Sequence, residues 1–132
     1  MNADINSIQK IDFRKVVSKD DIAVTEKLAR EIWNEHYVKI IGQAHVDYML
    51  EKFQSRKAIS EQIAHGYEYY IINHNGKDSG YTALAPEKEP ATVLLSKIYL
   101  RKSSRGLGLG REIISFVEDL CRKRDIRKKR LS

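Results

Sequence analysis

The alternation of apolar and polar residues predicts one strand near the N-terminus and a group of strands in the second half of the chain. The stretch YEYYII, residues 67–72, is rich in tyrosine and isoleucine, which favour strands. Asn75-Gly76 follows it and is a strong β-hairpin signal, so the next apolar stretch should return as its partner. The predicted strands cover residues 9–17, 67–72, 79–85 and 92–100, and a fifth begins at Ile126.

Apolar residues at helical spacing separate the first predicted strand from the second. Ser18 and Ser55 are good N-caps for two of these helices, and Gly66 is a good C′ residue after the second. A last helix follows the fourth strand and has Cys121 on its apolar face, where we expect a core residue rather than a nucleophile. The predicted helices cover residues 18–37, 43–53, 55–65 and the stretch that carries Ile113, Ile114, Val117 and Leu120.

The resulting order is β-α-α-β-β-β-α, followed by the start of the fifth strand. This order indicates the α/β (α+β) class, with a mixed, mainly antiparallel sheet flanked by helices. A chain of 132 residues suits one domain, residues 1–132, and no composition shift suggests a linker.

Composition excludes several classes of protein. No apolar run approaches the roughly 20 residues that span a membrane, and the N-terminus lacks the pattern of a signal peptide. Cys121 is the only cysteine, so an internal disulfide and a cysteine-based zinc site are excluded. These features predict a cytoplasmic protein without a membrane partner.

The net charge of +6 is concentrated near the C-terminal end of the chain. Residues 122–130 contain seven basic side chains and one acid, Asp125. A basic tail can bind nucleic acid, and such binding would depend steeply on salt. However, no aromatic residues interleave with this tail, so we expect a solvated helix end and no nucleic-acid partner.

The stretch from Leu94 to Arg124 reads as a strand, a glycine-rich loop and an amphipathic helix. Such a loop leaves backbone N–H groups unpaired at a helix N-terminus, and glycines let a ligand approach them closely. The ligand that suits this arrangement is a phosphate or pyrophosphate. Arg111 stands where the dinucleotide pattern G-x-G-x-x-G requires its third glycine, and the string G-x-x-x-x-G-K-[ST] does not occur.

The pattern that does occur is R-x-x-G-x-G, with Arg105, Gly108 and Gly110, after a strand that ends in I-Y-L-R. It resembles the signature of the GNAT superfamily of acyl-CoA N-acyltransferases. The order of the elements also resembles the N-terminal two-thirds of that fold. The resemblance covers nearly the whole chain, and its most specific part is residues 98–111.

The resemblance implies a co-substrate, acetyl-CoA, and a place for it. In this family the strand before the loop diverges from the next strand and opens a V-shaped slot. Backbone groups of that strand would bind the pantetheine arm, and the loop amides would bind the pyrophosphate. The residues implied are Ile98, Tyr99, Leu100, Arg105, Gly106, Leu107, Gly108, Leu109, Gly110 and Arg111. The reaction implied is direct attack of a primary amine on the thioester in a ternary complex.

The acceptor pocket in such folds is built partly by the first two helices, which here carry Trp33, Glu35 and Tyr37. Glu35 could attract an ammonium group, and the aromatic rings could wall it by cation–π contact. Trp33 as a core residue is the alternative. His36 has no second metal ligand three or four residues away, so no metal is expected. The acceptor would be a small-molecule amine or a protein amino group.

The resemblance leaves the catalytic residues unknown. Many members use a tyrosine on a helix after the fifth strand, and this chain stops at Ser132, within that strand. Some members use a glutamate on the fourth strand, but residues 92–100 contain no carboxylate. We therefore expect a domain incomplete at its C-terminus, with an open sheet edge that favours a homodimer. A catalytically silent acyl-CoA-binding or interaction domain is the alternative function.

Overall fold

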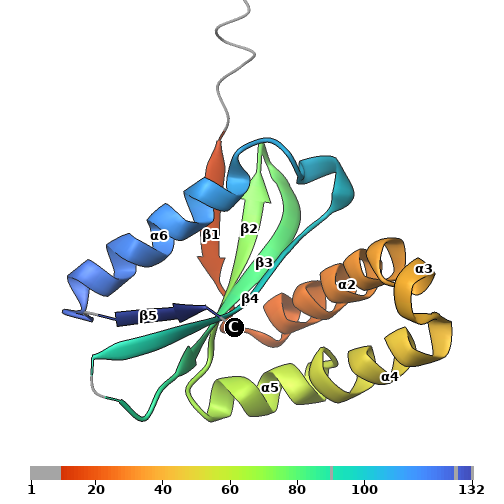
Figure 1. The fold of residues 1–132 in the computed structure, drawn as a ribbon, viewed down its shortest axis with the longest axis horizontal. Helices are drawn as coiled ribbons and strands as arrows, with labels where there is room; N and C mark the ends of the chain where they lie inside the picture. The colour runs from red at the N-terminus through yellow and green to blue at the C-terminus, as the bar shows by residue number, and fades with distance from the viewer. Residues whose placement is uncertain (1–9, 90, 127, 132) are drawn as a thin grey trace, which may run out of the picture.

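The computed structural model describes residues 10–89, 91–126 and 128–131, the last four by their backbone only (Figure 1). Five strands form one sheet in the order β1-β2-β3-β4-β5. The first four run antiparallel to their neighbours, and β5 runs parallel to β4. The strands are β1 Ile11–Lys15, β2 Glu68–His74, β3 Lys77–Pro86, β4 Thr92–Leu100 and β5 Lys128–Leu131.

Helices cover both faces of the sheet (Figure 1). Helix α6 lies on one face, and the other four α-helices lie on the opposite face. The helices are α2 Lys19–His36, α3 Val38–Ile41, α4 Gln43–Phe53, α5 Arg56–Ala64 and α6 Leu109–Lys123, with a short 3-10 turn, η1, at Lys102–Ser104. The mixed, mainly antiparallel fold predicted from the sequence is confirmed. Between β1 and β2, the three predicted helical ranges correspond to α2, α4 and α5, and the structure adds the short helix α3, so the stated order with two helices there is incomplete.

Local signals explain where these elements begin and end. The Ser18 and Ser55 hydroxyls accept hydrogen bonds from backbone N–H groups in the first turns of α2 and α5, as expected for N-caps. Asn75 and Gly76 both have positive φ at the hairpin between β2 and β3. Gly66, after α5, also has positive φ. These predictions are confirmed, and β5 begins at Lys128, two residues after the predicted start.

The two faces of the sheet have separate cores. Alternate residues of β2 point to opposite sides, so Tyr69 packs with α2 and α5, and Tyr70 packs with α6. Because both faces are covered, β2 reads as a continuous apolar run rather than as an alternating one. Cys121 is buried in the α6 core, as predicted.

The sheet opens along β4. Strand β5 pairs only with the first part of β4, where Thr92 lies opposite Lys128 and Leu95 opposite Leu131. Residues 97–100 continue β4, and no strand within the described ranges pairs with them on that edge. The open edge leads directly into η1 and then into the N-terminus of α6. A ligand bound at the N-terminus of α6 can therefore reach free backbone groups of β4.

Candidate functional site

The glycine-rich loop has the backbone conformation that its sequence predicts at two positions. Gly106 and Gly108 adopt φ of 77° and 78°, a left-handed conformation that favours glycine. Gly108 is the N-cap of α6 and offers no side chain to cap the helix. Leu109 turns its side chain into the core, with an exposed fraction of 1%, so only its backbone faces the loop. The start of α6 is therefore held by a buried leucine and left open on its outer side.

The first turn of α6 presents unpaired donors. The backbone N–H groups of Gly108, Leu109, Gly110 and Arg111 donate to no other group in the described part of the chain. Unpaired donors and the helix dipole are features that suit an anion, and the Arg111 side chain could add a charge-assisted bond. No group of three or more His, Cys, Asp or Glu side chains within the described ranges is arranged to hold a metal ion.

Gly110 gives the clearest indication of a ligand. Its φ is not positive, and a Cβ built there would meet no protein atom within 4 Å. Neither the backbone conformation nor packing against other described parts of the chain therefore requires glycine at this position. A bound group that lies against the helix N-terminus would require it, because a side chain would occupy the same space. The site thus fits the phosphate group that the sequence predicts.

Helix α2 holds the segment between β4 and the loop. Glu35 accepts a hydrogen bond from the Lys102 backbone N–H at 2.6 Å, and Glu31 forms an ion pair with Arg101. The Arg105 guanidinium donates to the Leu100 carbonyl at 3.1 Å and lies 3.3 Å from His36 Nδ1. These contacts fix the approach of the chain to the glycines, with Arg105 turned partly toward α2.

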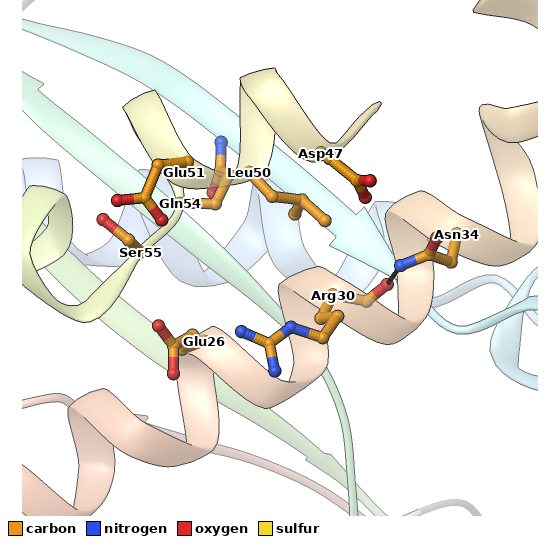
Figure 2. A pocket seen from close by; sticks show the side chains of 8 residues that line it. All are labelled: Glu26, Arg30, Asn34, Asp47, Leu50, Glu51, Gln54 and Ser55. Atoms are coloured by element: carbon orange, nitrogen blue, oxygen red, sulfur yellow. Dashed lines mark hydrogen bonds between the residues drawn. The ribbon is translucent and has the colours of Figure 1, made fainter. Parts of the chain in front are cut away.

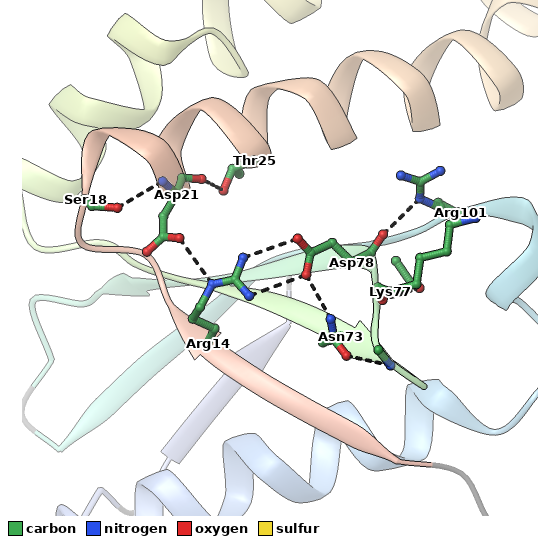
Figure 3. A network of polar contacts seen from close by, with 10 residues as sticks. Arg14, Ser18, Asp21, Thr25, Asn73, Lys77, Asp78 and Arg101 are labelled. Carbon is green, nitrogen blue, oxygen red and sulfur yellow. Dashed lines mark hydrogen bonds and ion pairs between the residues drawn. The ribbon is translucent and has the colours of Figure 1, made fainter.

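A second network of polar contacts connects Arg101, at the end of β4, to strands β3, β2 and β1 (Figure 3). The Arg101 Nε donates to the Asp78 carbonyl oxygen at 3.1 Å. The Asp78 carboxylate in turn accepts from Asn73 and from Arg14, and Arg14 also contacts Asp21 at 3.2 Å. Asp78 and Asp21 raise the pKa of Arg14, so this guanidinium stays charged. The start of the loop is therefore anchored to β1, to the β2–β3 hairpin and to α2.

The residues predicted for the acceptor do not form one cluster. Trp33 is buried, with an exposed fraction of 7%, and packs against Tyr37 and Tyr99 at ring distances of 4.5 and 5.7 Å. Glu35 is turned toward the loop, where it contacts Lys102. Tyr99 also faces α2, and burial raises the pKa of its hydroxyl. The structure thus assigns packing contacts to Trp33, Tyr37 and Tyr99, and a loop contact to Glu35.

A pocket of about 230 Å³ lies between α2 and α4 (Figure 2). Its walls carry three carboxylates, Glu26, Asp47 and Glu51, and one guanidinium, Arg30. Burial would raise the pKa of Glu26, but hydrogen bonds from Arg56 lower it below its usual value. Glu26 is paired with Arg56 at 2.8 Å, so Asp47 and Glu51 are the carboxylates of the lining that could face a cationic group, and Gln54 closes the pocket toward the sheet.

Sequence reasoning missed Lys97, whose ammonium group lies among neutral polar groups beside Tyr69. A bulge in β4 explains this. Leu84 pairs with Leu95 and Ala83 with Lys97, so Ser96 is an extra residue. Strict alternation would place Lys97 on the α6 side with Leu95, but the bulge turns it to the opposite face. A strand pattern alone carries no signal for such a turn.

Known structures with the same fold contain coenzyme A. PaiA N-acetyltransferase from Thermoplasma acidophilum, solved in complex with coenzyme A, has a TM-score of 0.78 at 19% identity over 92% of this chain and 78% of its own. A predicted acetyltransferase from Clostridium acetobutylicum, solved with acetyl-CoA, has a TM-score of 0.61 at 17% identity over 93% of this chain and 80% of its own. The fold is therefore that of these acetyltransferases.

The family follows from the sequence. The model of the acetyltransferase (GNAT) family matches residues 26–131, and this chain belongs to that family. An uncharacterized N-acetyltransferase in the pepI 3′ region of Lactobacillus delbrueckii subsp. lactis is 27% identical over 114 residues, which are 81% of this chain. The chain spans 66% of the length of that relative. Of the helices within the described ranges, none combines the length and apolar character that a membrane crossing requires.

Proposed function

We propose that this chain is an acyl-CoA-dependent N-acetyltransferase that transfers the acetyl group of acetyl-CoA to a primary amine in a ternary complex. The observation that carries the proposal is the first turn of α6. Within the described ranges, four backbone N–H groups are unpaired there, and the space beside Gly110 is open. Coenzyme A has a pyrophosphate that suits such a site, and it supplies an activated thioester.

The residues of this chain would bind and orient the co-substrate. The backbone amides of Gly108, Leu109, Gly110 and Arg111 would hold the pyrophosphate. The side chain of Leu109 is buried, so only its amide would take part. The exposed Leu107 borders the same loop. Along the open edge of β4, backbone groups of residues 98–100 would pair with the pantetheine arm, since β5 occupies only residues 92–95 of that edge. Membership in the acetyltransferase family and the coenzyme A complexes of similar folds support this assignment.

The acceptor would be a cation before it reacts. In the pocket between α2 and α4, Glu26 is paired with Arg56, and the carboxylates of Asp47 and Glu51 outnumber the Arg30 guanidinium, which favours an ammonium group over an anionic acceptor. Such a group must lose its proton before it can attack a thioester. A small-molecule amine and a flexible lysine of a protein both meet these requirements. The proposal assigns no catalytic acid or base.

The experiment is a thiol-release assay with acetyl-CoA and a panel of a diamine, an aminoglycoside and a lysine peptide at pH 8. We expect release that depends on one class of amine and is lost in the Gly110→Asp variant. Acetyl-CoA binding without turnover across the panel would indicate the silent binding domain instead. If neither the wild-type chain nor a longer version of it binds acetyl-CoA while folded, the proposed function is wrong.

A further inference from the structure

Lys97 has an unusual environment for a lysine. Its Nζ lies 2.5 Å from the Tyr69 hydroxyl, 3.1 Å from Gln62 Oε1 and 3.2 Å from the Phe53 carbonyl oxygen. Gln54 Oε1 lies 3.5 Å away, and the ammonium group also stands over the Tyr69 ring. These neighbours come from the α4–α5 turn, from α5 and from β2. The side chain therefore bridges the sheet and the helices above it.

None of these neighbours carries a negative charge. No ion pair joins Lys97 to a carboxylate among the described residues, and every acceptor around Nζ is neutral. A partly buried ammonium group without a counter-charge is costly, because neutral dipoles replace only part of its hydration. Burial accordingly lowers the pKa of Lys97 to about 8. A substantial fraction of this side chain is then an uncharged amine near pH 8.

The titratable groups that face Lys97 are tyrosines that carry no charge. Burial raises the pKa of Tyr69, so its hydroxyl stays protonated and neutral; it donates to Gln62 Oε1 at 2.5 Å and accepts from Lys97 Nζ. Burial also raises the pKa of Tyr81, whose hydroxyl donates to Gln54 at 2.8 Å and so fixes the amide beside Lys97. Gln62 and Phe53 can also accept an N–H of the amine. The uncharged amine can therefore donate its two N–H groups to these acceptors, and none of these contacts occupies its lone pair.

The position of Lys97 along β4 places it next to the open edge. Pairing with β5 ends at Leu95, the bulge falls at Ser96, and Lys97 is the next residue. A linear ligand that is anchored at the N-terminus of α6 and follows the free edge of β4 would end where β5 closes that edge. Its reactive end would then lie at the level of residues 96–98. The Lys97 side chain leaves the strand at this level and remains partly exposed to solvent.

We propose that Lys97 is a nucleophilic lysine and a site of acyl modification by thioesters. The uncharged amine attacks the thioester carbonyl carbon, an N–C bond forms, and the C–S bond breaks. The proton that the nitrogen loses ends on the departing sulfur, so the products are an amide and a thiol. Small thioesters would react at this site directly. Delivery of the acyl group by acetyl-CoA rests in addition on the proposed function.

The test compares lysines within one folded protein. The chain is treated at pH 8 with the acetyl thioester of N-acetylcysteamine, which lacks a pyrophosphate and does not need the loop. Peptide mass spectrometry then gives the acetylation rate of Lys97 and of two exposed lysines, Lys57 and Lys123. We expect Lys97 to react at least about tenfold faster, because far more of it is uncharged at this pH than of a lysine of ordinary pKa. Its rate should be half-maximal near pH 8.

Two controls make the outcome decisive. The Lys97→Arg variant keeps hydrogen-bond donors at this position and should lose only the fast-labelled peptide. In urea the rate of Lys97 should fall to that of the reference lysines. Labelling of Lys97 in the folded protein no faster than Lys57 and Lys123 would overturn the proposal. If acetyl-CoA gives no faster labelling than the small thioester while Lys97 stays reactive, the failure belongs to the proposed function instead.

Discussion

The two faces of the sheet present opposite kinds of polar site. On the α6 side, the loop offers backbone N–H groups from consecutive residues. The lack of a side chain at Gly110 leaves room for a ligand beside these groups. On the α2–α5 side, Lys97, Tyr69, Gln54 and Tyr81 meet through side chains that come from distant parts of the sequence. The first site depends on local conformation, and the second depends on the packing of the whole fold.

This difference determines how each site should respond to change. A backbone site tolerates side-chain substitution except where a new Cβ enters the ligand space. A packed side-chain site loses its geometry when any large neighbour is removed. Glu35 links the two, because it belongs to α2 and accepts a hydrogen bond from the backbone at the start of the loop.

The largest expected effect is on the packed side. Trp33→Ala removes a ring that contacts Tyr37 and Tyr99 and leaves a cavity, so the free energy of unfolding should fall by about 3–5 kcal/mol. Trp33→Phe should cost less than half of this, because it keeps a ring and removes a buried Nε1 for which the described residues provide no hydrogen-bond acceptor. Urea unfolding measures both. A loss of only amine affinity, without loss of stability, would instead favour Trp33 as an acceptor-binding residue.

The next effect is a dependence of stability on pH. The folded-state pKa of Lys97, about 8, lies below the unfolded value of 10.5, so folding disfavours its charged form. That penalty is fully present below pH 8 and is relieved as the pH rises toward 10.5. The stability of wild type minus that of Lys97→Met should therefore rise by about 2–3 kcal/mol between pH 7 and pH 10. Urea unfolding of both proteins at the two pH values checks this, and a constant difference would show an unperturbed lysine.

The smallest expected effect distinguishes two roles for Glu35. Glu35→Ala removes the acceptor for the Lys102 N–H and should raise the KM for acetyl-CoA by about tenfold, equivalent to about 1.4 kcal/mol, with little change in kcat. Glu35→Gln keeps a carbonyl oxygen at that position and should restore most of the affinity. Steady-state kinetics with both substrates decide the matter. An equal rise in the KM for the amine in both variants would identify Glu35 as the ammonium-binding residue.

Much of the fold could be predicted because its signals are local. Ser18 and Ser55 as caps, Asn75-Gly76 as a hairpin and the loop before α6 each depend on a few neighbouring residues. That the loop residues bind a ligand is still a prediction. The backbone geometry of the loop, however, could be predicted from the positions of its glycines. The separation of α4 from α5 was also predicted, from the Ser55 cap, but the short helix α3, Val38–Ile41, was not, because four residues between Tyr37 and Gly42 are too few to show a helical period.

The Lys97 cluster could not be predicted for a physical reason. Its members meet only after β2, β3, β4 and the α4–α5 turn have packed together, and no spacing in the sequence encodes that meeting. The bulge at Ser96 also reverses the side to which Lys97 points. Glu35 was predicted to face an acceptor, but the η1 turn brings the Lys102 backbone N–H within its reach.

The most direct test of the loop as the co-substrate site is isothermal titration of the chain with acetyl-CoA, with Gly110→Asp and Gly110→Ala beside it. An aspartate in the first turn of α6 suits the helix dipole and replaces a glycine, so the Gly110→Asp protein should be at least as stable as wild type. Its charge and bulk would nevertheless oppose a pyrophosphate, and we expect a loss of affinity of at least about 100-fold, or about 2.7 kcal/mol. Gly110→Ala should fall between the two. Equal affinity of all three folded proteins for acetyl-CoA would contradict this assignment, because the pyrophosphate would then not lie beside Gly110.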